Sequence, residues 1–141
     1  MSCVFCRVIA GQERASFVYR DDLCSAFLDI RPVTPGHVLI VPTSHAASVA
    51  ELDDESLAAM MRAAKKVDRA LRESTVACEG VTILLADGIA AGQKVLHVHL
   101  HLFPRYQNDG FGFVYPAGYS RGAPREDLDL LADELRATVG A

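Results

Sequence analysis

Histidine and apolar residues alternate strictly along residues 96–102, in the run L-H-V-H-L-H-L. Because successive side chains of a strand point to opposite faces, this period of two predicts a strand over Val95–Pro104. One face would carry Leu96, Val98, Leu100 and Leu102, and the other would carry His97, His99 and His101. We expect the apolar face to pack into the core. The histidine face is expected to carry chemistry, because clustered imidazoles cost desolvation energy in a strand that only packs.

The rest of the chain predicts further strands and three helices. The expected strands are Phe17–Tyr19 and Cys24–Asp29, a hairpin around Asp21 and Asp22, followed by His37–Val41 and Val81–Ala86. The expected helices are Cys3–Ala10, Asp53–Glu73 and Glu126–Val139, and Ser48 with Glu51 has the spacing of a capping box. Residues 87–93 and 106–124 read as glycine-bearing loops. Hairpins around one long helix favour an α+β fold with an antiparallel sheet.

Apolar residues recur at helical spacing in the two longer predicted helices. They are Leu57, Met60, Ala64, Val67 and Leu71 in the first, and Leu128, Leu131, Leu135 and Val139 in the second. The adjacent Met60 and Met61 are both expected in the core. Cys24 and Cys78 are expected as buried thiols.

Composition indicates one globular domain, 1–141. Of 141 residues, 50% are hydrophobic and 23% charged, with a net charge of −4, so no basic footprint for a nucleic-acid polymer is present. The apolar runs are too short to span a membrane, and the N-terminus lacks the layout of a signal peptide. A cytoplasmic protein is the expectation. In a reducing compartment its four cysteines favour thiols or metal ligands over disulfides.

The spacing Cys3-x-x-Cys6 is the second chemical signal. Two thiolates at this spacing can bind one zinc ion, although a redox pair or two buried thiols explain the pair alone about as well. His45 follows a predicted strand, and His97 begins the histidine row. Together with the cysteines they would complete a closed Cys2His2 site. Such a site is structural, because no ligand position remains for water.

The central histidine of the row suits nucleophilic catalysis. A neutral imidazole attacks activated phosphorus when one nitrogen is open and a fixed acceptor binds the other, so His99 is the candidate. His101 would donate to a phosphate oxygen or to the leaving group. The loop before the row, with Gln93, either surrounds an anion or is a plain connection. Asp29 either binds a ribose diol or caps a turn.

These residues resemble the histidine triad (HIT) family. The signature of three histidines alternating with hydrophobic residues matches His97–Phe103. Further similar segments are Cys3–Cys6 with Ile9–Gly11, Phe27–Pro32, Pro35–Pro42, Ala91–Gln93 and Pro104–Arg105. The similarity covers about residues 3–106, and the tail 107–141 diverges.

The resemblance implies a HIT-like fold, a twisted antiparallel sheet with one long helix and a C-terminal helix, usually as a homodimer. It implies a purine nucleotide or nucleotide conjugate as substrate, cleaved at the α-phosphorus through a nucleotidyl-His99 intermediate. His101 and His37 would surround the phosphate or support the nucleophile, and Gln93 would contact phosphate oxygens. Asp29 would bind the ribose, and Phe27 and Ile30 the base. Zinc-bearing members have ligands at positions matching Cys3, Cys6, His45 and His97.

Two positions depart from the family pattern. Ala86 stands where an asparagine is common, and Lys94 replaces a hydroxyl residue of the phosphoramidase branch. They motivate an alternative, a nucleotide-binding regulatory or adaptor protein with vestigial catalysis. A third hypothesis is a metallohydrolase in which all three triad histidines hold a catalytic zinc.

Overall fold

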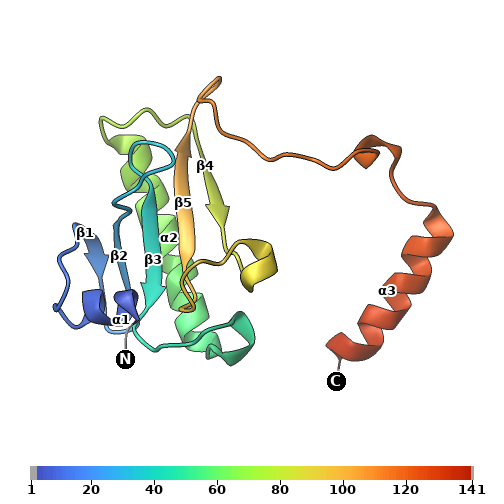
Figure 1. Ribbon diagram of the computed structural model, residues 1–141, viewed down its shortest axis with the longest axis horizontal. Coiled ribbons are helices and arrows are strands. Elements are labelled where there is room, and N and C mark those ends of the chain that lie inside the picture. The colour runs from blue at the N-terminus through green and yellow to red at the C-terminus, as the bar shows by residue number, and fades with distance from the viewer. Residues whose placement is uncertain (1–2, 141) are drawn as a thin grey trace. The chain divides into compact units, whose positions relative to one another are not determined.

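The computed structural model describes residues 3–140, which divide after Phe111 into two units (Figure 1). The first unit holds one five-stranded antiparallel sheet in the order β1-β2-β3-β5-β4. The strands are β1 (Phe17–Arg20), β2 (Cys24–Leu28), β3 (Val38–Pro42), β4 (Gly80–Leu84) and β5 (Leu100–Arg105). The helices are α1 (Val4–Ile9), α2 (Asp54–Glu73) and α3 (Arg125–Val139), and α3 belongs to the second unit. The predicted α+β class and antiparallel sheet are confirmed.

Helix α2 covers one face of the sheet and supplies much of the core. Its buried positions are Ser56, Ala59, Met60, Ala63, Ala64, Val67 and Leu71, the spacing of one helical face. Asp53 caps the helix by accepting from the Ser56 N–H at 2.8 Å. The predicted bounds therefore err by one residue. Met61 is 48% exposed, so its expected place in the core is wrong: consecutive helical side chains point about 100° apart.

Helix α1 covers part of the opposite face. Phe5 and Val8 of α1 pack with Phe27, Leu39 and Val41 in a second buried cluster. Strand β3 is therefore buried on both faces, which matches its uninterrupted apolar sequence. Among residues 3–140, no helix is both long and apolar enough to cross a membrane.

The predicted strand Val95–Pro104 is too long at its N-terminal end. Strand β5 begins at Leu100, and residues 95–99 approach it as irregular chain. The N–H of Val98 donates to the carbonyl of Ala46 at 2.8 Å, which directs this segment toward the loop after β3. Leu96 is 52% exposed as a result, whereas Val98, Leu100 and Leu102 are buried as expected.

Two smaller expectations also change. Ser48 makes no side-chain capping bond, and it precedes only a 3-10 turn, Val49–Glu51. Glu51 instead accepts from the N–H of Ala47 at 3.1 Å. Cys24 is buried as expected, but Cys78 is only half-buried, and all four cysteines are free.

The second unit consists of a loop, a 3-10 turn at Tyr119–Arg121 and helix α3. The predicted helix is confirmed to within one residue. Its apolar row is exposed, with Leu128, Leu131, Leu135 and Val139 between 41% and 84% accessible.

Candidate functional site

The histidine row lies on the sheet face that carries α1. Val98, Leu100 and Leu102 point into the core beneath α2, so the intervening histidines take the other side. The Phe5 ring of α1 meets His97 and His99 edge-on, with centroids 5.9 and 5.1 Å away. The alternation therefore separates core from site as predicted, even though only His101 of the three histidines is in the strand.

His99 has the geometry of a nucleophile. Its Nδ1 lies 2.7 Å from the backbone carbonyl of His97. A carbonyl only accepts, so the proton of neutral His99 is on Nδ1, and Nε2 keeps its lone pair. Thr34 Oγ1 is the one fully buried side-chain nitrogen or oxygen of the described chain without a partner, so the unpaired Nε2 of His99 is accessible. Burial lowers the pKa of His99, which keeps the ring neutral at neutral pH.

His101 and His37 form a hydrogen-bonded pair beside the nucleophile. His37 Nε2 lies 2.9 Å from His101 Nδ1, and the His99 and His101 ring centroids are 4.8 Å apart. The His101 ring stacks on Phe103 at an interplanar angle of 10°. Burial lowers the pKa of His37, and burial with the neighbouring His99 and His37 lowers the pKa of His101 to about 4. Both rings are therefore neutral at neutral pH.

Asp29 follows β2 and faces this pair. One carboxylate oxygen accepts from the Arg31 N–H at 2.8 Å, which is the turn-capping role considered from sequence. The other oxygen lies 3.6 Å from His37 Nδ1. The side chain is 21% exposed, and its ribose role stays a prediction.

Gln93 lies in the loop before the histidines, and its amide is engaged by that loop. Its oxygen accepts from the Gly88 N–H at 2.7 Å, and its nitrogen donates to the carbonyls of Ala47 and Val95 at 2.9 and 3.0 Å. The side chain therefore holds residues 88–95 against the loop after β3. Its contact with phosphate stays a prediction.

The two predicted base-pocket residues differ in exposure. Phe27 is 5% exposed and packs edge-on against Phe5 and Phe17, with centroids 5.8 Å away in each case. Ile30 is 88% exposed and leaves a large apolar side chain in solvent near the end of β2. The base-binding role of the two residues also stays a prediction.

Cys3, Cys6, His45 and His97 come together, with all their ligand atoms within 4.8 Å of one another. His97 Nδ1 lies 3.4 Å from Cys3 Sγ, 3.6 Å from Cys6 Sγ and 3.1 Å from His45 Nδ1. Tetrahedral zinc gives edges of about 3.4 Å between two nitrogens and about 3.6 Å between nitrogen and sulfur. The four residues therefore fit zinc in both donor chemistry and spacing.

The hydrogen bonds around this cluster also suit a metal. His97 Nε2 donates to the Pro42 carbonyl at 2.9 Å, which leaves the lone pair of Nδ1 for an ion. Among residues 3–140, the other group able to hold a metal is Asp29, His37 and His101. Neither group contains two triad histidines. The arrangement thus gives no support to a catalytic zinc held by all three of them.

Residues 10–108 match the model of the HIT domain. The chain belongs to the HIT family.

Solved structures of HIT proteins are similar to this chain. A HIT family member from Bacillus subtilis superposes with a TM-score of 0.87 and 38% identity, covering 97% of this chain and 96% of that one. A zinc-bound histidine triad family protein from Mycobacterium smegmatis gives a TM-score of 0.76 and 37% identity, covering 86% and 87%. The HIT-like fold expected from the triad is confirmed.

One HIT relative carries an enzyme name. The adenosine 5′-monophosphoramidase of Schizosaccharomyces pombe is 34% identical over 140 residues, which span 99% of this chain and 99% of that protein.

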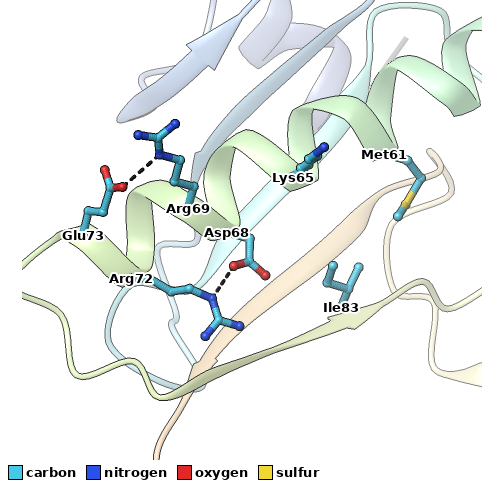
Figure 2. Close-up of a pocket in the computed structure, with 7 residues that line it drawn as sticks. All are labelled: Met61, Lys65, Asp68, Arg69, Arg72, Glu73 and Ile83. Carbon is cyan, nitrogen blue, oxygen red and sulfur yellow. Dashed lines mark hydrogen bonds and ion pairs between the residues drawn. The ribbon is translucent and has the colours of Figure 1, made fainter.

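A separate pocket of this HIT domain lies between α2 and β4 (Figure 2). Its lining residues are Met61, Lys65, Asp68, Arg69, Arg72, Glu73 and Ile83, and none of them is a histidine. Arg69 pairs with Glu73 at 2.8 Å and Arg72 with Asp68 at 2.5 Å, so the guanidinium groups are neutralised within the helix. The pocket lies away from the triad and contributes nothing to it.

Sequence reasoning missed three participants in the HIT site. Phe5 lies between the two cysteines and touches two triad rings, and Phe103 continues the period of two beyond His101 to stack on it. Both could have been found from spacing. The third is the backbone N–H of Val33, which donates to His37 Nδ1 at 3.2 Å. A contact made by the backbone cannot be predicted from residue type, because the N–H group does not depend on the side chain.

Proposed function

We propose that this chain is a nucleotide hydrolase or transferase that cleaves purine nucleotide conjugates at the α-phosphorus through a nucleotidyl-His99 intermediate. The observation that carries the proposal is the accessible, unpaired Nε2 of His99, whose partner nitrogen Nδ1 is tied to the His97 carbonyl. A neutral imidazole held in this tautomer is prepared to attack phosphorus. The named phosphoramidase among the relatives supports phosphoramidates as one substrate class.

The chemistry is a two-step displacement. The lone pair of His99 Nε2 forms a bond to the α-phosphorus while the bond to the leaving group breaks, and the leaving amine, phosphate or nucleotide departs with the electron pair. A leaving amine also takes up a proton from solvent, and the water of the second step returns one. Water then attacks the same phosphorus and releases the nucleoside monophosphate together with free His99. The His97 carbonyl keeps the Nδ1 proton in place throughout, and hydrogen bonds to the phosphoryl oxygens stabilise the charge that develops there.

The surrounding residues supply the binding roles in this proposal. Asp29 takes the ribose hydroxyls with its carboxylate, and Phe27 with Ile30 borders the base. Gln93 shapes the phosphate side through the loop whose backbone it holds. His37 and His101 lie beside the phosphate.

The proposed metal is a structural zinc on Cys3, Cys6, His45 and His97. All four ligand positions are filled by protein, so the ion pins the N-terminal segment to the sheet and supplies no reactive water. We also propose a homodimer in the cytoplasm. The free state of all four cysteines agrees with a reducing compartment.

The test is turnover of an adenosine 5′-phosphoramidate with a fluorogenic amine, comparing wild type with His99→Ala. Removing the nucleophile is expected to lower kcat/KM by at least about 10⁴-fold, because the covalent route is lost. Quenching the wild type during turnover into alkaline denaturant should reveal the nucleotidyl adduct by intact mass, and the variant should show none.

The His99→Ala variant must also be shown to be folded. Its circular dichroism spectrum and its metal content should match those of the wild type. Retained turnover in a folded variant would refute the covalent role of His99. Nucleotide binding without turnover of phosphoramidates or dinucleoside polyphosphates would instead establish the binding-protein alternative suggested by Ala86 and Lys94.

A further inference from the structure

Cys3 and Cys6 are the two sulfur ligands of the predicted zinc cluster, and both thiols are free and half-buried. Cys3 is the N-cap of α1, and its Sγ accepts from the Cys6 N–H at 3.5 Å. The ligand atoms of the cluster all lie within 4.8 Å of one another, so the two sulfurs are neighbours. The spacing Cys-x-x-Cys is also that of reversible dithiols. Both interpretations of the spacing, zinc ligands and a redox pair, therefore apply to the same two sulfurs.

The other two thiols are too far away to pair with them. Cys24 and Cys78 pack in the cluster beneath α2, whereas Cys3 packs in the cluster beneath α1, on the opposite face of the sheet. Cys24 is fully buried, and burial raises its pKa to about 11, which keeps it an unreactive thiol. Among residues 3–140, the thiol that Cys6 can reach is therefore that of Cys3.

The cluster is open to solvent on one side. His97 is fully buried, the two cysteines are half-buried and His45 is exposed. Cys6 Sγ lies 3.4 Å from the Nδ1 of this exposed histidine. A small polar oxidant can therefore reach the sulfurs from the His45 side.

The buried ligand connects the cluster to the nucleophile. His97 Nδ1 lies 3.4 Å from Cys3 Sγ, and the His97 carbonyl holds the Nδ1 proton of His99 at 2.7 Å. Phe5 lies between the two cysteines in the chain, and its ring meets the rings of His97 and His99. The carbonyl and the aromatic ring that position His99 are thus both carried by segments that bear zinc ligands.

We propose that Cys3 and Cys6 form an oxidation site, at which a peroxide converts the two thiolates to a disulfide, expels the zinc and thereby slows nucleotidyl transfer to His99. The inference rests on the proposed structural zinc and, for its effect on turnover, on the proposed function. Phe5 and His97 are positioning residues in this scheme, because they act through His99.

The step balances with hydrogen peroxide as the oxidant. One thiolate attacks a peroxide oxygen, which breaks the O–O bond and gives a sulfenic acid and a hydroxide. The second thiolate attacks the sulfenic sulfur, forms the S–S bond and expels a second hydroxide. Two protons from solvent convert the two hydroxides to water. The two electrons come from the two sulfurs alone, so the ion is released as Zn²⁺.

A disulfide would remove half of the ligand set. Its sulfurs carry no negative charge, so the imidazoles of His45 and His97 would remain, and a structural zinc site needs four ligands. Helix α1 has six residues and would then be attached mainly by the burial of Phe5 and Val8. Displacing Phe5 and the His97 carbonyl lowers the rate, because attack on phosphorus depends on alignment to within about 1 Å.

The chemical test treats the zinc-loaded, full-length protein with hydrogen peroxide and follows the metal with a chromogenic chelator. We expect release of about one zinc per chain. Intact mass should show a product two hydrogens lighter than the reduced chain, and a peptide map should place the bond between Cys3 and Cys6. Dithiothreitol and zinc should reverse both changes. Zinc retained in the disulfide form, or a stable product with oxygen added at either cysteine and no S–S bond, would overturn the proposal.

Cys6→His is the matched variant, because it keeps a zinc ligand but leaves Cys3 without a thiol partner. It should hold its zinc at peroxide concentrations that empty the wild type, and equal loss would show that the disulfide does not expel the metal. Cys78→Ser removes a thiol outside the cluster and should lose zinc as the wild type does. If Cys6→His does not fold, the mass and peptide map of the wild type still decide the site.

Turnover of the adenosine 5′-phosphoramidate tests the link to His99. Oxidation should lower kcat/KM of the wild type by about 10–100-fold and leave Cys6→His within about twofold of its own untreated value. Hydrogen exchange should become faster in residues 3–10 at the same time, because α1 loses an attachment. Full turnover by the zinc-free disulfide form would overturn the link between the metal and the nucleophile.

These readouts separate the possible failures. A wild type that contains no zinc would refute the metal site and this inference with it. Zinc release and a disulfide in a protein that turns over no conjugate would support the oxidation site and refute the proposed function.

Discussion

Single hydrogen bonds to the backbone decide the chemistry of the three imidazoles in this site. The His97 carbonyl holds the proton of His99 on Nδ1, and the Val33 amide sets the tautomers of His37 and His101. Each contact contributes the free energy of about one hydrogen bond, yet it selects which nitrogen can attack and which can donate. The identity of a histidine therefore says less about its role than the backbone group beside it.

The depressed pKa values predict how activity depends on pH. Burial lowers the pKa of His99 below its ordinary value and that of His101 to about 4, so both stay neutral well into the acid range. We expect kcat/KM to remain level from pH 8 downwards and to fall only below about 6.5, the pKa of a free histidine. A pH–rate profile with its acid inflection at or above 6.5 would contradict this.

The same shifts set a limit on stability in acid. Histidines of the unfolded chain bind protons near pH 6.5, whereas these folded ones do not, so the unfolded state binds more protons as pH falls. The free energy of unfolding therefore decreases from about pH 6.5 downwards. Circular dichroism at each pH separates this loss from protonation of the nucleophile.

Helix α1 depends on contacts with the rest of the chain for its stability. It has six residues, far fewer than an isolated helix needs, and Cys3 is its N-cap through a bond from the Cys6 N–H. The burial of Phe5 and Val8 and the proposed zinc attach it to the sheet. Because Phe5 also touches His97 and His99, the placement of α1 bears directly on the site.

Removing a zinc ligand is therefore expected to release α1. Wild-type protein purified without chelator should contain about one zinc per chain by elemental analysis, and Cys6→Ser should lose it. The free energy of unfolding should fall by a few kcal/mol, because metal binding is coupled to folding. Cys78→Ser is the matched control, since that thiol lies outside the cluster and should retain zinc. Near-zero zinc in the wild type would count against the site.

At the scale of the whole molecule, the chain divides after Phe111. Just before this point the Arg105 guanidinium binds both carboxylate oxygens of Asp109, the hydroxyl of Thr82 and the carbonyl of Phe111. This pairing holds the pKa of Asp109 well below its usual range. We call these contacts of Arg105 the Arg105 clamp. The Phe111 ring packs edge-on against Phe103, with ring centroids 5.1 Å apart, so the clamp belongs to the first unit.

Two shortened chains test this boundary. A chain ending at Phe111 keeps the clamp and every buried residue of the sheet, so its Tm should lie within a few degrees of the full-length value. A chain ending at Tyr106 loses Asp109 and Phe111 and leaves Arg105 without its carboxylate. It should melt at a lower temperature than the chain ending at Phe111, as expected for a lost charged hydrogen-bond network. Equal Tm values for the two shortened chains would show that the clamp does not stabilise the fold.

The sequence by itself determined the elements and the chemistry they present. Periods of two and 3.6 are local properties of the chain, so they predicted α2 to within one residue and the division of the triad segment into core and histidine faces. The spacing of Cys3 and Cys6 and the supply of histidines predicted the zinc cluster. Resemblance of the motifs to the HIT family added the fold and its expected activity.

Only the tertiary structure decided where the triad strand begins and how each imidazole is held. Strand β5 starts at Leu100 because the Val98 N–H pairs with Ala46, some fifty residues earlier in the chain. The side-chain amide of Gln93 is hydrogen-bonded to loop backbone, and the Val33 N–H donates to His37 Nδ1. These contacts join backbone groups, which every residue carries, and their pairing is fixed only when distant segments pack together.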